Sequence, residues 1–386
     1  MTEEKKPVIV VDDSPVVRTL LKHIIDGSPE FYVAAQAGDG LEAVAFIKKM
    51  RPAVVTMDVQ MPRMDGPSAI KEIMRDCPTP IIVCSVLAVE GAPVVLRSLE
   101  YGAFDFVTKP RSVMSDPNLF AAVLLGKLRA ALTANRASLA AAPGDPLPAS
   151  DEPEPAAAQE TGSATASRQP TIPAAVPSGF EGSIPAEVVV FGSSTGGPKA
   201  ILSILPGFPR DFAPAVIVAL QDVPGQILKL IADQLSKVCA LPVEMATTER
   251  PVMGGKILLI GAESHAMLIR GAETEPRLKL LERQLATEQS PSLNGLFSSI
   301  AVACPGRCIG ILLTGTGKDG ALGLKKIRQA GGRTMVEDKR TAVVYDKPAA
   351  AIALDIVDMV LPSQKIVEAI LQVLACAPAA VAVLSH

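Results

Sequence analysis

The chain has 386 residues, a formal net charge of -3 and a pI near 5.8. This length exceeds the roughly 100 to 200 residues of an ordinary domain, so two cores and connecting chain are expected. Lysines and arginines are scattered, which argues against nucleic acid as a partner. No apolar run reaches the roughly 20 residues that span a membrane and no signal peptide opens the chain, so we expect a cytoplasmic protein that is not membrane-inserted. The six cysteines are then expected to be buried free thiols.

Residues 1–130 predict a first α/β domain. Short β-branched runs alternate with amphipathic stretches, a pattern typical of a parallel sheet with helices on both faces. Ser14 is expected to cap the first helix and Pro15 to open it. The expected strands are residues 8–11, 32–37, 54–57, 81–84 and 104–108.

Residues 131–182 predict a flexible linker, because they are rich in Ala, Pro, Ser, Gly and Glu and hold almost no large apolar side chain. Residues 183–378 again show strand-like apolar runs alternating with helix-like stretches, which predicts a second α/β domain. Both domains are therefore expected to be doubly wound parallel sheets, the first flavodoxin-like and the second Rossmann-like. The elements expected in the second domain are strands at 187–191, 215–220 and 308–313, a helix opened by Pro198 and a helix over 225–236.

Three carboxylates of the first domain fall at strand ends: Asp12 and Asp13 after the first strand and Asp58 after the third. In a sheet of order 2-1-3-4-5 these ends are neighbours, and clustered acids favour a bound Mg²⁺. Ser85 and Lys109 follow the next two strands and supply a hydroxyl and an ammonium for phosphoryl oxygens. An Asp-Asp pair alone is more often a turn or helix cap, but five such groups together predict phosphoryl transfer to a carboxylate.

The segments VVDDSPVVR, TMDVQMPRMDG, VCS and FVTKP together resemble the response-regulator receiver domain over about residues 5–125. The resemblance implies that Asp58 accepts phosphate from a sensor histidine kinase of chemotaxis type, and that Asp12, Asp13 and Asp58 hold Mg²⁺. The residues that would sense the phosphoryl group are, by the same resemblance, Ser85, Phe106 and Lys109.

The second domain carries a candidate nucleophile in Gly192-Ser193-Ser194-Thr195-Gly196-Gly197, which fits G-x-S-x-G between a strand and a helix. Small residues allow a sharp turn that exposes the Ser194 hydroxyl and points free amides at an oxyanion. A phosphate-cradling or merely structural turn is the alternative for this motif alone. Asp319, on a Gly-rich loop after a later strand, is a candidate for the orienting acid of a triad.

FGSSTGGPKAI and LLTGTGKDGALG resemble the catalytic domain of the chemotaxis protein-glutamate methylesterases over about residues 185–375, and the receiver, linker and hydrolase order is that family's order. The resemblance implies that Ser194 attacks glutamate methyl esters on methyl-accepting chemoreceptors, that methanol leaves an acyl-enzyme, and that Asp319 is the orienting acid. It implies no cofactor in this domain. Some members of the family also deamidate receptor glutamines, and phosphorylation of the receiver releases its block on the active site.

The sequence departs from the family at the catalytic base. The family's Gln-His-Met-Pro motif corresponds to Gln221-Asp222-Val223-Pro224, so Asp222 stands at the histidine position. A carboxylate with a pKa near 4 is a much weaker base than imidazole, unless burial raises its pKa. The family's Arg-Pro-Ser-Val-Asp pattern is likewise changed to Ser290-Pro291-Ser292-Leu293-Asn294.

Three hypotheses follow from this departure. The first is an active methylesterase in which Asp222 or His265 serves as the base. The second is a catalytically impaired pseudo-enzyme that acts as a phosphorylation-controlled binding module. The third is a generic α/β-hydrolase, whose histidine should follow the acid and for which only His386 qualifies. His23, the remaining histidine, is expected on the solvated face of the first helix.

Overall fold

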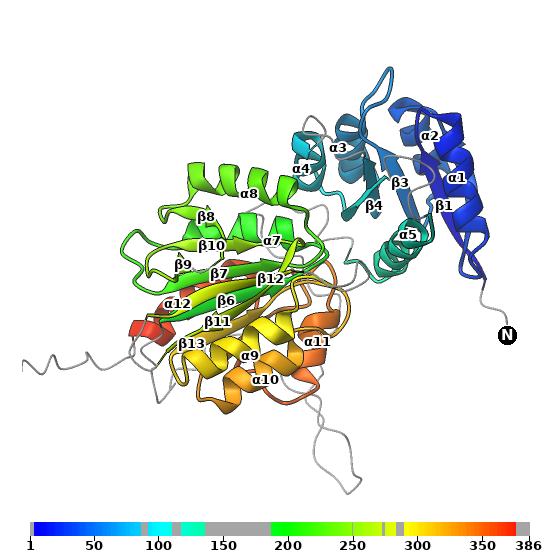
Figure 1. The fold of residues 1–386 in the computed structure, drawn as a ribbon. Helices are drawn as coiled ribbons and strands as arrows, with labels where there is room; N and C mark the ends of the chain where they lie inside the picture. The colour runs from blue at the N-terminus through cyan, green and yellow to red at the C-terminus, as the bar shows by residue number, and fades with distance from the viewer. Residues whose placement is uncertain are drawn as a thin grey trace, which may run out of the picture.

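The computed structural model describes residues 4–85, 92–109, 117–135, 187–248, 250–271, 275–282 and 289–375. Most of the predicted linker lies outside the described residues, as do His386 and Cys376. The described chain forms two α/β domains (Figure 1). Within it, no helix has the length and apolar character needed to cross a membrane.

The first domain is a five-stranded parallel sheet of order β2-β1-β3-β4-β5, which confirms the predicted topology. The first helix begins as predicted, because Pro15 opens it and the Ser14 hydroxyl accepts the Val17 N–H. Asp39 caps the second helix in the same way. The strands are β1 (Lys6–Val11), β2 (Phe31–Ala37), β3 (Val54–Asp58), β4 (Ile81–Ser85) and β5 (Asp105–Thr108). The helices are α1 (Pro15–Asp26), α2 (Gly40–Met50), α3 (Gly66–Asp76), α4 (Ala92–Glu100) and α5 (Pro117–Leu132).

The second domain is built on a seven-stranded parallel sheet of order β15-β14-β13-β6-β7-β10-β8, which confirms the predicted parallel α/β class. Its strands are β6 (Val188–Ser193), β7 (Ala215–Leu220), β8 (Val243–Met245), β10 (Ile257–Ile260), β13 (Cys308–Leu312), β14 (Arg333–Glu337) and β15 (Met359–Leu361). The α-helices are α7 (Gly197–Ile204), α8 (Gly225–Val238), α9 (Leu293–Ala303), α10 (Ala321–Gln329), α11 (Asp346–Ile352) and α12 (Ile366–Ala375), with 3-10 turns at Leu205–Gly207 and Ser363–Lys365.

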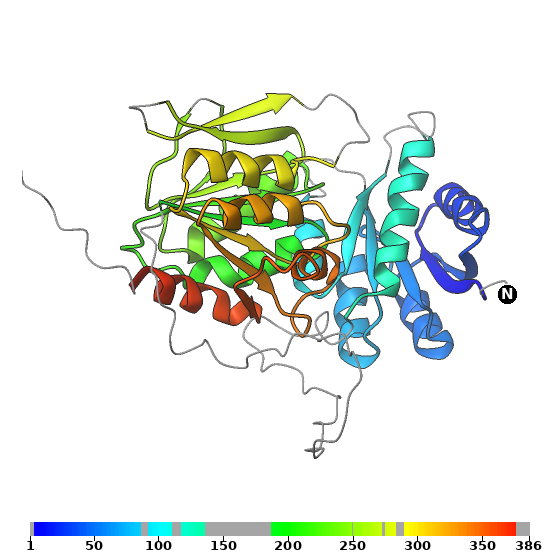
Figure 2. The same cartoon turned by 90° about the horizontal axis from the view of Figure 1, so that it is seen from below.

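Helices cover both faces of this sheet and divide its core in two. Helices α7, α8 and α12 lie on one face, and α9 and α10 lie on the other (Figure 2). Their apolar side chains form two separate clusters, one on each face. The central strand β6 pairs with β7 on one side and with β13 on the other. The carboxyl ends of β6 and β13 therefore lie side by side at the point where the strand order reverses, the usual place for a ligand site in such sheets.

A small antiparallel sheet of order β11-β12-β9 adds to the second domain and was not predicted. Its strands are β9 (Arg250–Pro251), β11 (Ser264–Ile269) and β12 (Arg277–Glu282). Their side chains are half exposed and mixed in polarity, so they lack the continuous apolar runs that marked the buried parallel strands. This sheet packs against α9 through β11.

The two domains contact each other through α4, which packs on α7 and α8. Glu100 accepts a hydrogen bond from Gln234 of α8 across this contact. Beyond α5, the backbone N–H of Asn135 donates to the Val343 carbonyl at 3.1 Å. The five cysteines within the described residues are free thiols, four of them buried, as the composition predicted.

Candidate functional site

The acid cluster of the receiver lies where β1 and β3 end. One carboxylate oxygen from each of Asp12, Asp13 and Asp58 lies within 4.8 Å of the other two. Asp12 is fully buried, and its Oδ2 accepts no properly aligned hydrogen bond from the residues that the structure describes. Three clustered carboxylates, two of them buried, supply the oxygen ligands that Mg²⁺ prefers, so these residues fit Mg²⁺.

Lys109 holds the two buried acids of this cluster together. Its Nζ lies 2.6 Å from Asp12 Oδ2, at ion-pair distance though poorly aligned for a hydrogen bond, and 3.0 Å from Asp58 Oδ1. Burial by itself lowers the pKa of Lys109, but the attraction of Asp58 and Asp12 outweighs burial and raises the pKa. Burial raises the pKa of Asp58, and Lys109 opposes only part of that effect. The lysine therefore remains a fixed positive charge beside the predicted phosphoacceptor.

The other predicted sensing residues lie on the adjoining strands. Ser85 is buried at the end of β4, and its carbonyl accepts the Lys109 N–H at 2.8 Å. Phe106 is buried in β5, with Lys127 Nζ 5.4 Å from its ring centroid. The structure thus brings Ser85 and Lys109 to the rim of the acid cluster.

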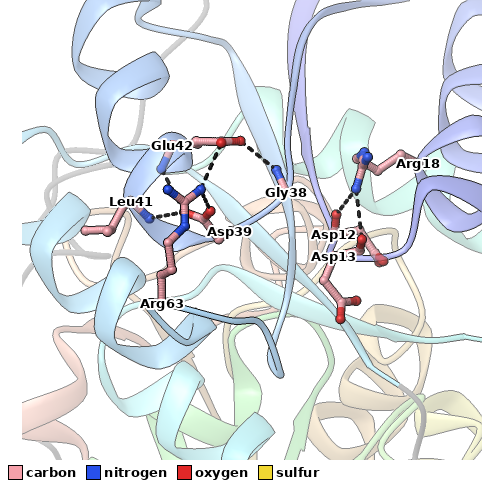
Figure 3. Close-up of polar contacts among 8 residues, drawn as sticks. All are labelled: Asp12, Asp13, Arg18, Gly38, Asp39, Leu41, Glu42 and Arg63. Carbon is pink, nitrogen blue, oxygen red and sulfur yellow. Dashed lines mark hydrogen bonds and ion pairs between the residues drawn. The ribbon is translucent and has the colours of Figure 1, made fainter.

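Two arginines brace the loops around this cluster (Figure 3). Arg18 of α1 donates from Nη1 to the carbonyls of Asp12 at 2.6 Å and Asp13 at 3.1 Å. Arg63, on the loop after Asp58, pairs with the carboxylates of Asp39 and Glu42 at the start of α2. Hydrogen bonds and ion pairs from neighbouring elements therefore hold the backbone around the acids. The motif spacing in the sequence did not indicate these contacts.

Ser194, the candidate nucleophile, follows β6 in the turn that leads into α7. It is 4 % exposed, and its Oγ accepts the Thr316 N–H at 3.0 Å. Gly196 in the same turn adopts φ +79°, a left-handed conformation that favours glycine. A Cβ on Gly197 would lie 2.6 Å from Ser193 Oγ, so a larger residue there would force the Ser193 side chain to move.

Asp319, the candidate orienting acid, lies on the loop after β13 at the same end of the sheet. Its carboxylate accepts hydrogen bonds from Gln221 Nε2 at 2.7 Å and from the N–H groups of Leu293 at 2.7 Å and Asn294 at 3.0 Å. The last two donors are the first turn of α9, a favourable place for a negative charge. The structure thus brings Asp319 to the carboxyl-end rim that carries Ser194, with its carboxylate already occupied by three donors.

Asp222 is exposed and adopts φ +60°, and its N–H donates to the Ser290 carbonyl at 3.0 Å. The expected burial of Asp222 is therefore wrong, because solvent reaches this residue. His265 lies in β11, and its Nδ1 accepts the Ser292 N–H at 3.0 Å. That bond engages the ring lone pair that a general base needs. His23 is exposed on α1, as predicted.

Lys347 is a residue of this site that the sequence analysis missed. It is fully buried at the start of α11, and its Nζ donates to Gln221 Oε1 at 2.6 Å and to the Asp319 carbonyl at 3.0 Å. Lysines are rarely buried completely, so a lysine in the polar stretch Tyr345-Asp346-Lys347-Pro348 gave no sign of a buried residue. The apolar residues before Tyr345 were the available hint that the chain runs inward here.

The receiver reaches the serine loop directly. Thr195 Oγ1, one residue after Ser194, donates to Asp105 Oδ2 of the receiver at 2.9 Å. Lys127 Nζ also contacts Asp105 Oδ2, at 2.6 Å, and Asp105 immediately precedes Phe106. Strand β5 of the receiver is therefore bonded to the residue that follows the candidate nucleophile.

A receiver with an intact acid cluster, attached to a parallel sheet with a serine loop at its switch point, defines a response regulator with a hydrolase-like output domain. The chain matches the family models "Response regulator receiver domain" over residues 8–122 and "CheB methylesterase" over residues 189–370. It is 38% identical over 366 residues, 95% of both chains, to the "Protein-glutamate methylesterase/protein-glutamine glutaminase" of Agrobacterium fabrum. The Bordetella parapertussis protein of the same name is 38% identical over 370 residues, covering 95% of this chain and 97% of its own. The chain belongs to this methylesterase/glutaminase family.

Proposed function

We propose that this protein hydrolyses glutamate methyl esters on chemoreceptors and that phosphorylation of Asp58 by a sensor histidine kinase controls the reaction. The observation that carries the proposal is the bond between Thr195 and Asp105, because it joins the serine loop to strand β5 of the receiver. The names of the relatives support the substrate class and suggest glutamine side chains as second substrates.

Control would begin at the acid cluster. Mg²⁺, held by Asp12, Asp13 and Asp58, would neutralise charge on the incoming phosphoryl group. Lys109 pairs with Asp58 now and would pair with a phosphoryl oxygen once Asp58 is modified. A shift of Lys109 pulls on Ser85, whose carbonyl accepts the Lys109 N–H, and on the adjoining strand β5. The bond from Asp105 to Thr195 lies at the start of that strand, so its loss would uncover Ser194.

Hydrolysis would then follow the acyl-enzyme route. Ser194 Oγ attacks the ester carbonyl, methanol leaves, and water releases the glutamate carboxylate and restores the serine. From a glutamine side chain the same attack would expel ammonia. Asp319 cannot move freely to meet substrate, because three N–H groups hold its carboxylate, so it acts by fixing the loop and its negative charge.

The test is release of radiolabelled methanol from a methylated chemoreceptor fragment, with the full chain treated with Mg²⁺ and acetyl phosphate. Release is expected to rise on phosphorylation and to be lost in Ser194→Ala. Asp58→Asn should keep the low basal rate and lose the stimulation. Methanol release that persists in Ser194→Ala would contradict the assignment of the nucleophile.

A second candidate, the impaired pseudo-enzyme, is favoured by the exposed Asp222, which by the motif resemblance stands where the family has its histidine. In that case the phosphorylated chain should bind a receptor fragment or a receptor-modifying partner without releasing methanol. Binding measured beside methanol release separates the two functions.

A further inference from the structure

Lys347 places an unusual amine beside the serine loop. The contacts of its Nζ described above are both to neutral oxygens, the side-chain carbonyl of Gln221 and the backbone carbonyl of Asp319. A fully buried lysine normally pairs with a carboxylate, because an isolated buried ammonium is costly. Two neutral acceptors suit a neutral amine equally well, since its two N–H groups would satisfy them and its lone pair would remain for a proton.

The side chains of Ser194 and Lys347 both pack against the Cα of Gly315. A Cβ built on Gly315 would lie 2.4 Å from Ser194 Oγ and 2.7 Å from both Cδ and Cε of Lys347. Because Gly315 has no side chain, Ser194 and Lys347 can both occupy the space beside its Cα. The Lys347 N–H also donates to the Gly315 carbonyl at 3.2 Å, so this loop and the start of α11 are joined by backbone as well.

The surroundings favour the neutral amine at moderate pH. Burial lowers the pKa of Lys347 to about 8, although the charges of Asp319, Asp222 and Asp346 oppose this. About one tenth of the amine would be neutral at pH 7, within the range that general bases use. The other candidate bases are less suited, because Asp222 is exposed and His265 Nδ1 is engaged by Ser292.

We propose that Lys347 is the general base that activates Ser194, so that the serine works with a lysine in place of a histidine. The inference rests on the proposed hydrolysis and deepens it. Lysine amines serve as bases for serine nucleophiles on unrelated folds, which makes the chemistry available.

The proton moves as follows. The neutral Lys347 amine takes the Ser194 hydroxyl proton, directly or through one water, as Oγ bonds to the ester carbon and the carbonyl electrons move to oxygen. The tetrahedral intermediate collapses, and its methoxide leaves as methanol with the proton from the Lys347 ammonium. In the second half the amine takes a proton from water as hydroxide adds to the acyl-enzyme. Collapse then returns that proton to Ser194 and releases the glutamate product. Asp222 would act only through its charge on Lys347.

The test measures the reactivity of Ser194 itself with a fluorophosphonate, which needs no methyl ester. The full chain, treated with Mg²⁺ and acetyl phosphate, is labelled between pH 6.5 and 9.5, with Ser194→Ala as the blank. The labelling rate is expected to rise with pH with a midpoint near 8. Lys347→Met should lower the rate by about 10² to 10⁴, the usual worth of a general base. Lys326→Met, the same change at an exposed lysine of α10, should label like the natural protein.

Asp222→Asn separates this proposal from a base at Asp222 and does not depend on the folding of a Lys347 variant. Its negative charge raises the pKa of Lys347, so its removal should shift the midpoint of the labelling profile to lower pH and preserve the plateau. The proposal is overturned if Asp222→Asn abolishes labelling. It is also overturned if the natural chain is not labelled, or if its labelling rate does not rise across this pH range. A folded Lys347→Met variant that is labelled within about threefold of the natural rate would overturn it as well. A chain that labels as expected and releases no methanol contradicts the proposed function alone. A chain that releases methanol undiminished in Lys347→Met contradicts this inference alone.

Discussion

Two buried lysines, Lys109 of the receiver and Lys347 of the output domain, lie at the carboxyl-end rims of their parallel sheets in opposite electrostatic settings. Lys109 lies between the carboxylates of Asp12 and Asp58, and its pKa is raised. Lys347 is held by neutral oxygens, and burial lowers its pKa to about 8. In both domains the sheet topology brings a lysine to the site. Its immediate partners then decide whether the amine stays protonated as a fixed charge or becomes neutral and able to accept a proton.

The largest expected effect concerns the acids around Lys109. Asp58→Asn is expected to abolish labelling by a radioactive phosphodonor, because Asp58 is the proposed phosphoacceptor and has the Asp12–Asp13 pair and Lys109 beside it. Removal of Mg²⁺ by a chelator should do the same. Phosphate found on Asp12 or Asp13 in the variant would contradict the assignment of Asp58 as the phosphoacceptor beside Lys109.

Arginine at each lysine position tests charge against proton transfer. Lys347→Arg keeps a positive charge and cannot deprotonate, so methanol release should fall by about 10² to 10⁴. Lys109→Arg keeps the charge that its role needs, so phosphorylation should fall by roughly tenfold or less. Rates of methanol release and of phosphodonor labelling are measured on the two variants, with circular dichroism to establish that each is folded. Equal losses in both would remove the distinction.

Stability should change in opposite directions when each lysine becomes methionine. Because the folded-state pKa of Lys347 is about 8, the unfolded chain holds more protons between about pH 8 and 10.5, and the free energy of unfolding rises with pH across that window. Lys347→Met should therefore stabilise the second domain by about 1 to 3 kcal/mol at pH 7 and by less at pH 10. The raised pKa of Lys109 gives stability that is present below about pH 10.5 and lost above it, so Lys109→Met should cost about 3 to 5 kcal/mol at pH 7.

Scanning calorimetry at pH 7 and pH 10 measures both changes. Lys326→Met serves as the control for replacing an exposed lysine. Destabilisation by Lys347→Met at pH 7 would show that the buried amine is held as a well-compensated charge, and the contrast with Lys109 would then be lost.

The smallest expected effect lies between the two sites. Thr195→Val removes the hydroxyl that bonds Asp105 and keeps a similar shape, so it should weaken the contact by about 0.5 to 1.5 kcal/mol. Basal methanol release without phosphorylation should rise by about twofold to tenfold, with little change in the phosphorylated rate. A lower basal rate would mean that the Thr195 hydroxyl serves the reaction more than the covered state.

Much of this architecture could be predicted from the sequence. Buried parallel strands have short runs of β-branched residues. The ends of β1, β3, β4, β7 and β13 were therefore predicted to within a residue or two. The positions of Asp12, Asp58 and Ser194 at converging strand ends could be predicted, because each follows such a run and the ends of parallel strands meet for topological reasons. The antiparallel strands β11 and β12 were missed, because a half-exposed strand of mixed polarity has no comparable pattern.

What only the tertiary structure decided is the state of the polar groups at those strand ends. Asp222 and Lys347 are both charged residues in polar stretches of sequence, yet one is exposed and the other is fully buried. The partners of Lys347 come from residues 28 and 126 positions away, and the bond from Thr195 to Asp105 spans 90 positions. Burial and hydrogen bonding across such separations depend on how the folded elements pack, so no local pattern could specify them.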